Sequence, residues 1–392
     1  MNILYSFRTR GVGAESVHIS GIANAFEDLG HEVDFVSPTK TDPRNQAGTN
    51  PYEKKQKTSL IHRFANQLPG VLFELAEVAY NWHAKAQISK SLNQKKYGLI
   101  YERHAFFLNA TSKIAQQAGI PYIVEVNELV GDERVRKQPL FTPLAKQCDR
   151  LTFERATRII VVSPHLKRKI QEEHGINERK ILVHPNAVEA ALLAKTPDPA
   201  IFVDRFNLNG KLNIGFVGWF VEWHRLDLML VAISDLIKSS PNLHPNLVLI
   251  GDGPLKETLQ AQAKSLNIES NITFTGPIDH SMIPAIIRAL DIAVIPHSNE
   301  FRSPIKLFEY MAQERPVIAP SSEPIRSVVS HGENALLFPP LDQSSLSQNL
   351  QRLANDSVLQ RRLGQNARKT VEQRHTWKHN AEHILEEIQN SR

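Results

Sequence analysis

The sequence has little of what marks secreted, membrane-spanning or metal-bound proteins. It contains one cysteine, Cys148, so no internal disulfide can form, which fits a reducing compartment. No apolar run reaches the roughly 18 residues that span a bilayer, and the N-terminal MNILYSFRTR lacks the apolar core of a signal peptide. We therefore expect a cytoplasmic protein, with peripheral association with a membrane left open.

Patterns that bind metals or nucleic acids are also missing. There are no cysteine pairs, no His-Glu-x-x-His segment and no Asp-x-Asp segment between strands, so no metal site is expected. The net charge is only +5, the basic residues are scattered among almost as many acidic ones, and no RNP1 motif occurs. We expect no nucleic-acid partner. An anionic substrate or an anionic membrane face explains the mild positive excess equally well.

The chain has 392 residues, enough for two domains of about 100–200 residues each. Short apolar runs alternate with amphipathic stretches, which predicts an α/β class with parallel sheets and helical crossovers. Breaker residues within 188–212 separate two such series, which predicts two doubly wound, Rossmann-like domains. The expected strands are 3–6, 33–37, 99–102, 122–126 and 159–163 in the first half, and 213–217, 247–250, 272–275, 292–295 and 317–319 in the second.

The most informative segment is NEFRSPIKLFEYMA at 299–312, which follows the strand expected at 292–295. Ser303 is a good N-cap and Pro304 suits the first helical position, so we expect a helix to begin here. Open parallel sheets bind ligands at the carboxyl ends of their strands, where this helix starts. The segment is therefore a candidate ligand site.

The first turn of that helix has the chemistry of an anion site. The amides of Ile305 and Lys306 have no partners within the helix, and the helix dipole favours an anion there. The positive charge of Lys306 opposes the dipole unless an anion is bound. Glu309, about a turn further on, can accept hydrogen bonds from a ribose diol. An ordinary capped helix with a solvated lysine and glutamate is the alternative.

This segment and the rest of the chain together resemble the family 4 retaining glycosyltransferases of the GT-B fold. The SPIKLFEYMA stretch looks like the family's E-x7-E segment, and the resemblance covers essentially the whole chain. Other similar pieces follow in the family's order: GHEV at 30–33, GFVG at 215–218, WHRLD at 223–227, IGDGP at 250–254, FTGPI at 274–278 and DIAVIP at 291–296. The combination of these segments, in this order, is what makes the resemblance to the family specific.

The resemblance implies two domains that face a cleft. The domain 1–190 would bind the acceptor, and the domain 191–374 would bind the nucleotide sugar. The helix at about 375–392 would pack back on the first domain. The donor-binding candidates are Gly13, Gly218, His224, Arg225, Gly251, Ile278, Glu300, Ser303, Ile305, Lys306, Leu307 and Glu309.

The resemblance also implies roles for some of these residues. Glu309 would bind the donor ribose, the amides of 305–307 with Lys306 would bind the diphosphate, and Ile278 would lie against the base through its backbone. Lys306 and Glu309 are therefore candidate catalytic residues. In the mechanism favoured for the family, the acceptor attacks the front face of the sugar and the leaving phosphate takes the acceptor's proton. The protein then contributes mostly electrostatic stabilisation of the leaving group.

The chain departs from the family pattern at three places. The first glutamate of E-x7-E falls on Phe301, with Glu300 one residue earlier. The family's phosphate-binding arginine and lysine fall on Trp219 and His224; His224 or Arg225 is the candidate substitute. The histidine that many members carry after a strand of the first domain falls on Asn127.

Two stretches of the first half follow expected strands and should face the ligand. Gly11 and Gly13 form a turn before a helix, but one Gly-x-Gly is weak support for a dinucleotide site. In a GT-B enzyme this turn would approach the donor phosphates or the acceptor. The acceptor-binding candidates are Glu102, Arg103 and Asn127. His104 is the candidate for a polar role in transfer, with a structural histidine as the alternative.

We expect a retaining hexosyl- or related glycosyltransferase. Its donor would be a nucleotide diphosphate sugar of the UDP or GDP type and its acceptor a hydroxyl, with no cofactor. A non-catalytic GT-B subunit, a nucleotide-sugar epimerase and a nucleic-acid-binding protein are the alternatives. The basic stretch 38–66 and the helix expected at 68–92, with Trp82, form either an insertion that contacts acceptor or membrane, or a solvated loop with a packed helix.

Overall fold

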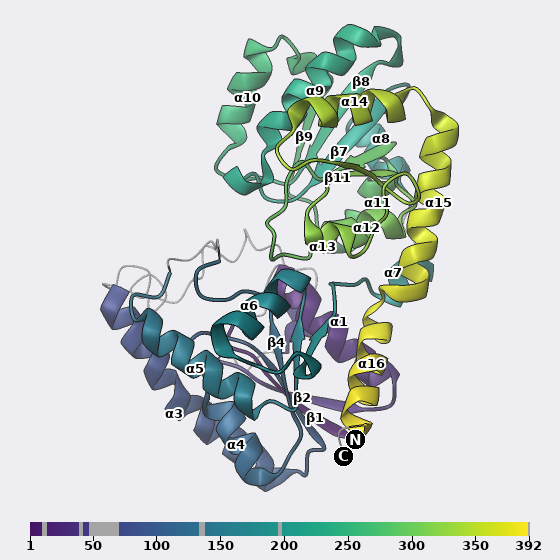
Figure 1. Cartoon of the computed structure of the whole chain (residues 1–392). Helices are drawn as coiled ribbons and strands as arrows, with labels where there is room; N and C mark the ends of the chain where they lie inside the picture. The colour runs from purple at the N-terminus through teal and green to yellow at the C-terminus, as the bar shows by residue number, and fades with distance from the viewer. Residues whose placement is uncertain (10–13, 39–41, 47–69, 133–137, 195–197, 391–392) are drawn as a thin grey trace. The chain divides into compact units, whose positions relative to one another are not determined.

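The computed structural model describes residues 1–9, 14–38, 42–46, 70–132, 138–194 and 198–390 (Figure 1). These form two compact units. The first unit is Met1–Pro185 with Trp377–Arg392, and the second is Asn186–Thr376. The chain leaves the first unit before residue 190, and only its last helix returns.

The first unit is a parallel sheet covered on both faces. Its strand order is β2-β1-β3-β4-β5-β6, and the pairs are parallel. The strands are β1 (Asn2–Ser6), β2 (Glu32–Val36), β3 (Leu99–Arg103), β4 (Tyr122–Val126), β5 (Arg158–Val161) and β6 (Ile181–Val183). The helices are α1 (Ala14–Asp28), α3 (Gly70–Gln94), α4 (Ala110–Ala118), α5 (Thr142–Arg155), α6 (Pro164–His174) and α16 (Trp377–Gln389), with short 3-10 turns at Pro43–Gln46 and Glu178–Lys180.

The apolar runs of the sequence explain this layering. β4 is buried along its whole length, as parallel strands are when helices cover both faces. Helices α1 and α16 pack together on one side of the sheet, and α3, α4, α5 and α6 lie on the other (Figure 1). The connection from β1 to β2 runs toward one edge of the sheet, and the connections from β2 through β3 to β6 run toward the other edge. Because both kinds of crossover are right-handed, their helices lie on opposite faces.

A glycine lets α16 lie against α1. Gly21 is inside α1, and a Cβ there would collide with the indole ring of Trp377. The ring of His18 meets the same indole edge-on, with 4.6 Å between ring centroids. Because a helical glycine costs about 1 kcal/mol relative to alanine, its presence here is explained by the close approach of the two helices.

The second unit has the same architecture. Its strand order is β12-β11-β10-β7-β8-β9. The strands are β7 (Leu212–Val217), β8 (Pro245–Ile250), β9 (Ile272–Gly276), β10 (Ile292–Val294), β11 (Val317–Pro320) and β12 (Leu336–Phe338). The helices are α7 (Ala190–Ala194), α8 (Ala200–Arg205), α9 (Leu226–Ser239), α10 (Lys256–Ser265), α11 (Ile283–Arg288), α12 (Ile305–Ala312), α13 (Glu323–Arg326), α14 (Gln343–Ala354) and α15 (Ser357–Arg374).

This strand order creates a switch point beside β7. The chain runs outward from β7 through β8 to β9, and later from β10 through β11 to β12 in the other direction. Ligands of open α/β sheets bind at the carboxyl ends of the strands where the order reverses. All the expected strands are present, with β6 and β12 in addition, so the α/β class with two doubly wound sheets is confirmed.

Candidate functional site

Two glycine turns meet at the switch point of the second unit. Gly218 follows β7 with φ of 150°, and Gly251 follows β8 with φ of 131°. A Cβ on Gly251 would collide with the carbonyl oxygen of Gly218, and a Cβ on Gly218 would lie 2.7 Å from Nζ of Lys306. Both turns therefore require glycine, and they leave a place where backbone and the lysine ammonium come close together.

Helix α12 begins next to these turns. Its N-cap is Pro304, which is extended, and the helix starts at Ile305. The amide of Leu307 donates to the carbonyl of Pro304 over 3.0 Å. Within the described residues the amides of Ile305 and Lys306 have no hydrogen-bond acceptor in the structure. These two N–H groups can therefore bind an anion at the positive end of the helix.

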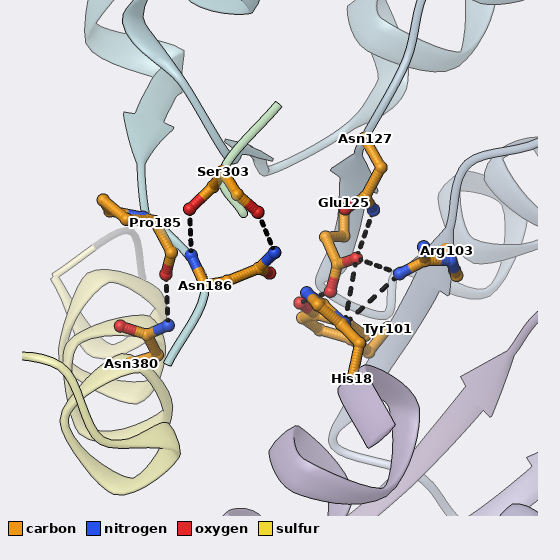
Figure 2. A network of polar contacts seen from close by, with 9 residues as sticks. All are labelled: His18, Tyr101, Arg103, Glu125, Asn127, Pro185, Asn186, Ser303 and Asn380. Atoms are coloured by element: carbon orange, nitrogen blue, oxygen red, sulfur yellow. Dashed lines mark hydrogen bonds and ion pairs between the residues drawn. The ribbon is translucent and has the colours of Figure 1, made fainter. Parts of the chain in front are cut away.

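Ser303 does not cap the helix, which corrects the expectation from the sequence. Its hydroxyl accepts a hydrogen bond from the amide of Asn186 over 2.9 Å, and the side chain of Asn186 donates to its carbonyl over 2.6 Å (Figure 2). The serine is 6% exposed. Asn186 therefore anchors the chain before the helix at Ser303, whose hydroxyl accepts from Asn186 instead of from a first-turn amide of α12.

Lys306 is a half-buried cation at this helix terminus. Its Nζ lies 3.9 Å from the ring centroid of Phe216 and 3.3 Å from Nε2 of His224. In the described part of the chain, no carboxylate oxygen lies within salt-bridge distance of it. Burial lowers the pKa of Lys306 to about 7. A lysine held in this way gains from an anionic ligand, which would restore its charge.

His224 is neutral and serves as the acceptor for Lys306. Burial, with the charge of Lys306 as the next cause, lowers the pKa of His224 to about 2. Its Nδ1 lies 2.7 Å from the carbonyl oxygen of Trp219, so Nδ1 carries the proton and Nε2 accepts. His224 therefore does not replace the positive charge of the family's lysine. The guanidinium of Arg225 is engaged by Asp227, at 2.9 and 2.7 Å.

Glu309 lies on α12 and meets a histidine from a distant segment. Nε2 of His280 is 3.5 Å from Oε1 of Glu309, and this contact raises the pKa of His280. Ile278, two residues before the histidine, packs partly buried against the core. The segment after β9 thus comes beside Glu309, a relationship that sequence reasoning missed because 28 residues separate His280 from Glu309.

The contact made by the hydroxyl of Tyr310 was also not predicted from the sequence. This hydroxyl accepts a hydrogen bond from the amide of Val217 over 2.8 Å, and this ties α12 to the end of β7. Phe301, at the position of the family's first glutamate, is 4% exposed. The carboxylate of Glu300 is exposed and lies 3.5 Å from the amide of Glu323, at the start of α13.

In the first unit, Glu125 organises a polar cluster at the end of β4 (Figure 2). Its carboxylate accepts hydrogen bonds from Arg103 at 2.9 Å, Tyr101 at 2.7 Å and the side-chain amide of Asn127 at 2.5 Å. Burial alone would raise the pKa of Glu125, but the charges of His18 and Arg103 outweigh it and hold the pKa below its usual range. An ionised carboxylate can only accept, so the NH₂ of Asn127 faces Glu125 and its carbonyl oxygen points elsewhere.

Two candidates of the first unit are buried, which corrects their expected placement. Glu102 is 1% exposed and accepts from the hydroxyl of Tyr122 over 2.7 Å, and burial raises its pKa to about 7. Nε2 of His104 lies 2.8 Å from Asp149, and both side chains are 2% exposed. Both side chains point into the core because they lie on, or just after, a central strand. His104 is thus paired with a buried carboxylate, and its polar role in transfer stays a prediction. Gly13, the remaining candidate, lies outside the described residues.

The described residues contain neither a metal-binding cluster nor a helix that could cross a membrane. No group of three or more histidine, cysteine, aspartate or glutamate side chains there could hold a metal ion. None of the described helices combines the length and the apolar character that crossing a membrane requires.

Family models match both halves of the chain. The model for glycosyltransferase family 4 matches residues 15–192, and the model for glycosyl transferases group 1 matches residues 200–370. Among curated proteins, the chain is 22% identical over 270 residues to an alpha-D-kanosaminyltransferase of Streptomyces kanamyceticus, covering 67% of this chain and 68% of that one. It is also 22% identical to an uncharacterized glycosyltransferase of Methanocaldococcus jannaschii, covering 96% and 94%.

Solved glycosyltransferase structures share the fold over the full length. HepE of Anabaena, crystallised with UDP, has a TM-score of 0.71 at 16% identity and full coverage of both chains. The sucrose-phosphate synthase of Thermosynechococcus elongatus has a TM-score of 0.69 at 18% identity, covering 99% of this chain and 98% of that one. With two family models that together span most of its length, the chain belongs to the family 4 glycosyltransferases of the GT-B fold.

Proposed function

We propose that the chain transfers a hexosyl or related sugar from a nucleotide diphosphate donor to a hydroxyl acceptor, with retention of the anomeric configuration. The second unit binds the donor and the first unit binds the acceptor. HepE has been crystallised with UDP-glucose, which supports testing UDP-sugars before GDP-sugars.

The observation that carries this proposal is the start of α12. Two free amides, those of Ile305 and Lys306, and one buried ammonium without a carboxylate partner converge there, among the described residues, beside the Gly218 turn. The diphosphate binds to these groups, which stabilise the charge of the leaving group as the sugar bond breaks. Glu309, partly buried one turn along the helix, accepts hydrogen bonds from the ribose.

The acceptor site centres on Asn127 and Arg103. The carbonyl oxygen of Asn127 is directed away from Glu125 and accepts a hydrogen bond from a substrate hydroxyl. Where many family members have a histidine, this chain therefore offers a neutral acceptor that cannot donate through the same atom. His18 and Arg103 together hold the pKa of Glu125 below its usual range, and the ionised carboxylate keeps the amide in that orientation.

We propose that no cofactor takes part and that donor binding needs no metal. Lys306 and the helix amides supply positive charge that a divalent cation supplies in other nucleotide sites. Calorimetric titration of the nucleotide before and after EDTA treatment tests this part, and an affinity that drops with EDTA contradicts it.

The decisive experiment is a panel of UDP, GDP and their sugars titrated into the wild-type chain, Lys306→Ala and Glu309→Ala. We expect one nucleoside diphosphate to bind and both substitutions to weaken it by about tenfold or more. Lys264→Ala and Glu257→Gln, at exposed positions of α10, are matched controls that should bind normally.

Retention and transfer are read separately, from the anomeric signal of the product by NMR. A nucleotide that binds without transfer to any hydroxyl acceptor would favour a non-catalytic GT-B subunit, which the buried Phe301 and the neutral His224 would suit. If no nucleotide binds, the assignment of a donor site to the start of α12 is wrong.

A further inference from the structure

Helix α3 exposes its apolar side chains instead of burying them. Trp82 is 79% exposed and Leu75 is 54% exposed, and Val71 and Val78 are exposed as well. These four residues are spaced by 4, 3 and 4 positions, so they form one stripe along the helix. A helix on the surface of a protein in water normally has the opposite arrangement.

The start of α5 extends this stripe into a patch. The buried carboxylate of Glu74, on α3, accepts hydrogen bonds from the amides of Leu140 and Phe141. This fixes the segment before α5 against α3, although its own side chains are exposed. The exposed apolar residues of the α3 patch are Val71, Leu72, Leu75, Val78, Trp82, Leu140, Phe141 and Leu144.

The charges around the patch are arranged by sign. The two acidic residues of α3 turn inward: Glu74 is 5% exposed, and Glu77 pairs with Arg8. The lysines Lys85 and Lys90 on α3 and Lys113 on α4 are exposed, and in the described part of the chain none of them has an ion pair. Solvent therefore meets apolar and cationic groups together on this face.

We propose that the α3 patch binds the surface of an anionic lipid bilayer. Apolar side chains on one face of a helix, with lysines beside them, are the arrangement by which helices lie in the plane of a membrane interface. The apolar side chains enter the boundary of the acyl chains, and the three lysines contact the anionic head groups. Contact of this kind is peripheral and requires no spanning helix. It does not rest on the proposed transfer reaction.

Other occupants fit the charge less well. In a two-fold symmetric contact with a second copy, the same lysines would face each other across the interface. The chain's own segment 47–69 carries Lys54, Lys55, Lys57 and Arg63 against one acidic residue, so its net charge has the same sign as the lysines of this face. An anionic bilayer complements Lys85, Lys90 and Lys113.

The test is co-sedimentation of the full chain with vesicles of phosphatidylcholine alone or mixed with phosphatidylglycerol. We expect binding to the mixed vesicles only, weakened by about tenfold in the double variant Lys85→Glu/Lys90→Glu and by at least about fivefold in Leu75→Ala/Trp82→Ala. The matched controls are Lys238→Glu/Lys264→Glu and Ile201→Ala/Val358→Ala, which change exposed residues of the second unit and should bind as wild type.

Tryptophan emission gives an independent readout, since the chain has four tryptophans and Trp82 is the exposed one of the patch. Mixed vesicles should shift the emission to the blue in the wild type but not in Trp82→Phe. The proposal is overturned if neither vesicle binds, if the α3 variants bind as wild type, or if they change only the oligomeric state. It is also overturned if Trp82 is already shielded from acrylamide without lipid, because the chain would then cover the patch itself.

Discussion

Nε2 of His224 accepts a hydrogen bond from the ammonium of Lys306 over 3.3 Å. The histidine is held in turn by the carbonyl of Trp219, so its proton lies on Nδ1 and its lone pair faces the lysine. The departure from the family pattern at His224 therefore has a structural consequence. Lys306 supplies positive charge beside the position where the family has a lysine, and a neutral ring positions it.

The first prediction concerns proton uptake by Lys306. Because burial lowers its pKa to about 7, part of the protein carries a neutral lysine at neutral pH. A bound diphosphate raises that pKa, so affinity is full below about pH 7 and falls as the pH rises through the range between the free and bound values. Calorimetry at about pH 8, in buffers of different ionisation enthalpy, should show uptake of up to about one proton per nucleotide. Uptake that persists in Lys306→Arg would assign the proton to another group.

The second prediction concerns His280 and Glu309. The pKa of His280 is raised in the folded state by its contact with Glu309. Its contribution to the free energy of unfolding is therefore full below the unfolded value of about 6.5 and is lost as the pH rises through the folded value. Since the imidazole is half exposed, we expect less than about 1 kcal/mol.

Urea unfolding of the wild type and His280→Asn at about pH 5.5 and about pH 8.5 measures this contribution. The wild type should be the more stable at the lower pH and nearly equal at the higher. Glu309→Gln is the matched control, since the pH dependence should vanish in that background. A difference that grows with pH would show that Glu309 is not the partner.

Much of the fold and part of the site could be predicted from the sequence, for reasons that differ between residues. Apolar runs predicted the central strands because parallel strands are buried on both faces. Lys306 and Glu309 stood out because a helix start is a local pattern. The place of His280 beside Glu309 could not be predicted, since no local pattern records which distant segments meet.

The structure differs from the expected helix cap at Ser303 and from the expected exposed placement of His104 for similar reasons. Ser303 has the residue type of an N-cap, but Asn186, more than a hundred positions earlier, occupies its hydroxyl. His104 follows a strand that ends at the expected edge of the sheet, yet its side chain turns toward Asp149 on α5. Side-chain direction at a strand end depends on packing partners that the sequence pattern does not reveal.

The third prediction tests the close approach of Gly21 and Trp377. Gly21→Ala should lower the free energy of unfolding by about 1–3 kcal/mol, because the new Cβ overlaps the indole ring. In a Trp377→Leu background the overlap is gone, and the same substitution should instead gain up to about 1 kcal/mol from helix propensity. Urea denaturation of the four proteins completes the cycle. Equal effects of Gly21→Ala in both backgrounds would refute the contact.

The fourth prediction compares the stability effects of two buried glutamates on neighbouring strands. Burial raises the pKa of Glu102 to about 7, so its ionisation costs stability: the cost is absent below about pH 4.5, grows with pH and is complete above about pH 7. Glu102→Gln keeps an acceptor for Tyr122 and should raise the free energy of unfolding by on the order of 3 kcal/mol at about pH 8, with little change at about pH 4. The gain measures the charge alone, because the two side chains are nearly isosteric.

Glu125→Gln should have the opposite effect. The pKa of Glu125 is held below its usual range, so this carboxylate stabilises the fold above its unfolded pKa of about 4.3, and that contribution is lost as the pH falls through the folded value. The substitution should therefore destabilise the protein at about pH 8, where Glu102→Gln stabilises it. Chemical denaturation across the pH range measures both variants. Effects of the same sign at about pH 8 would mean that Arg103 and His18 do not distinguish the two sites.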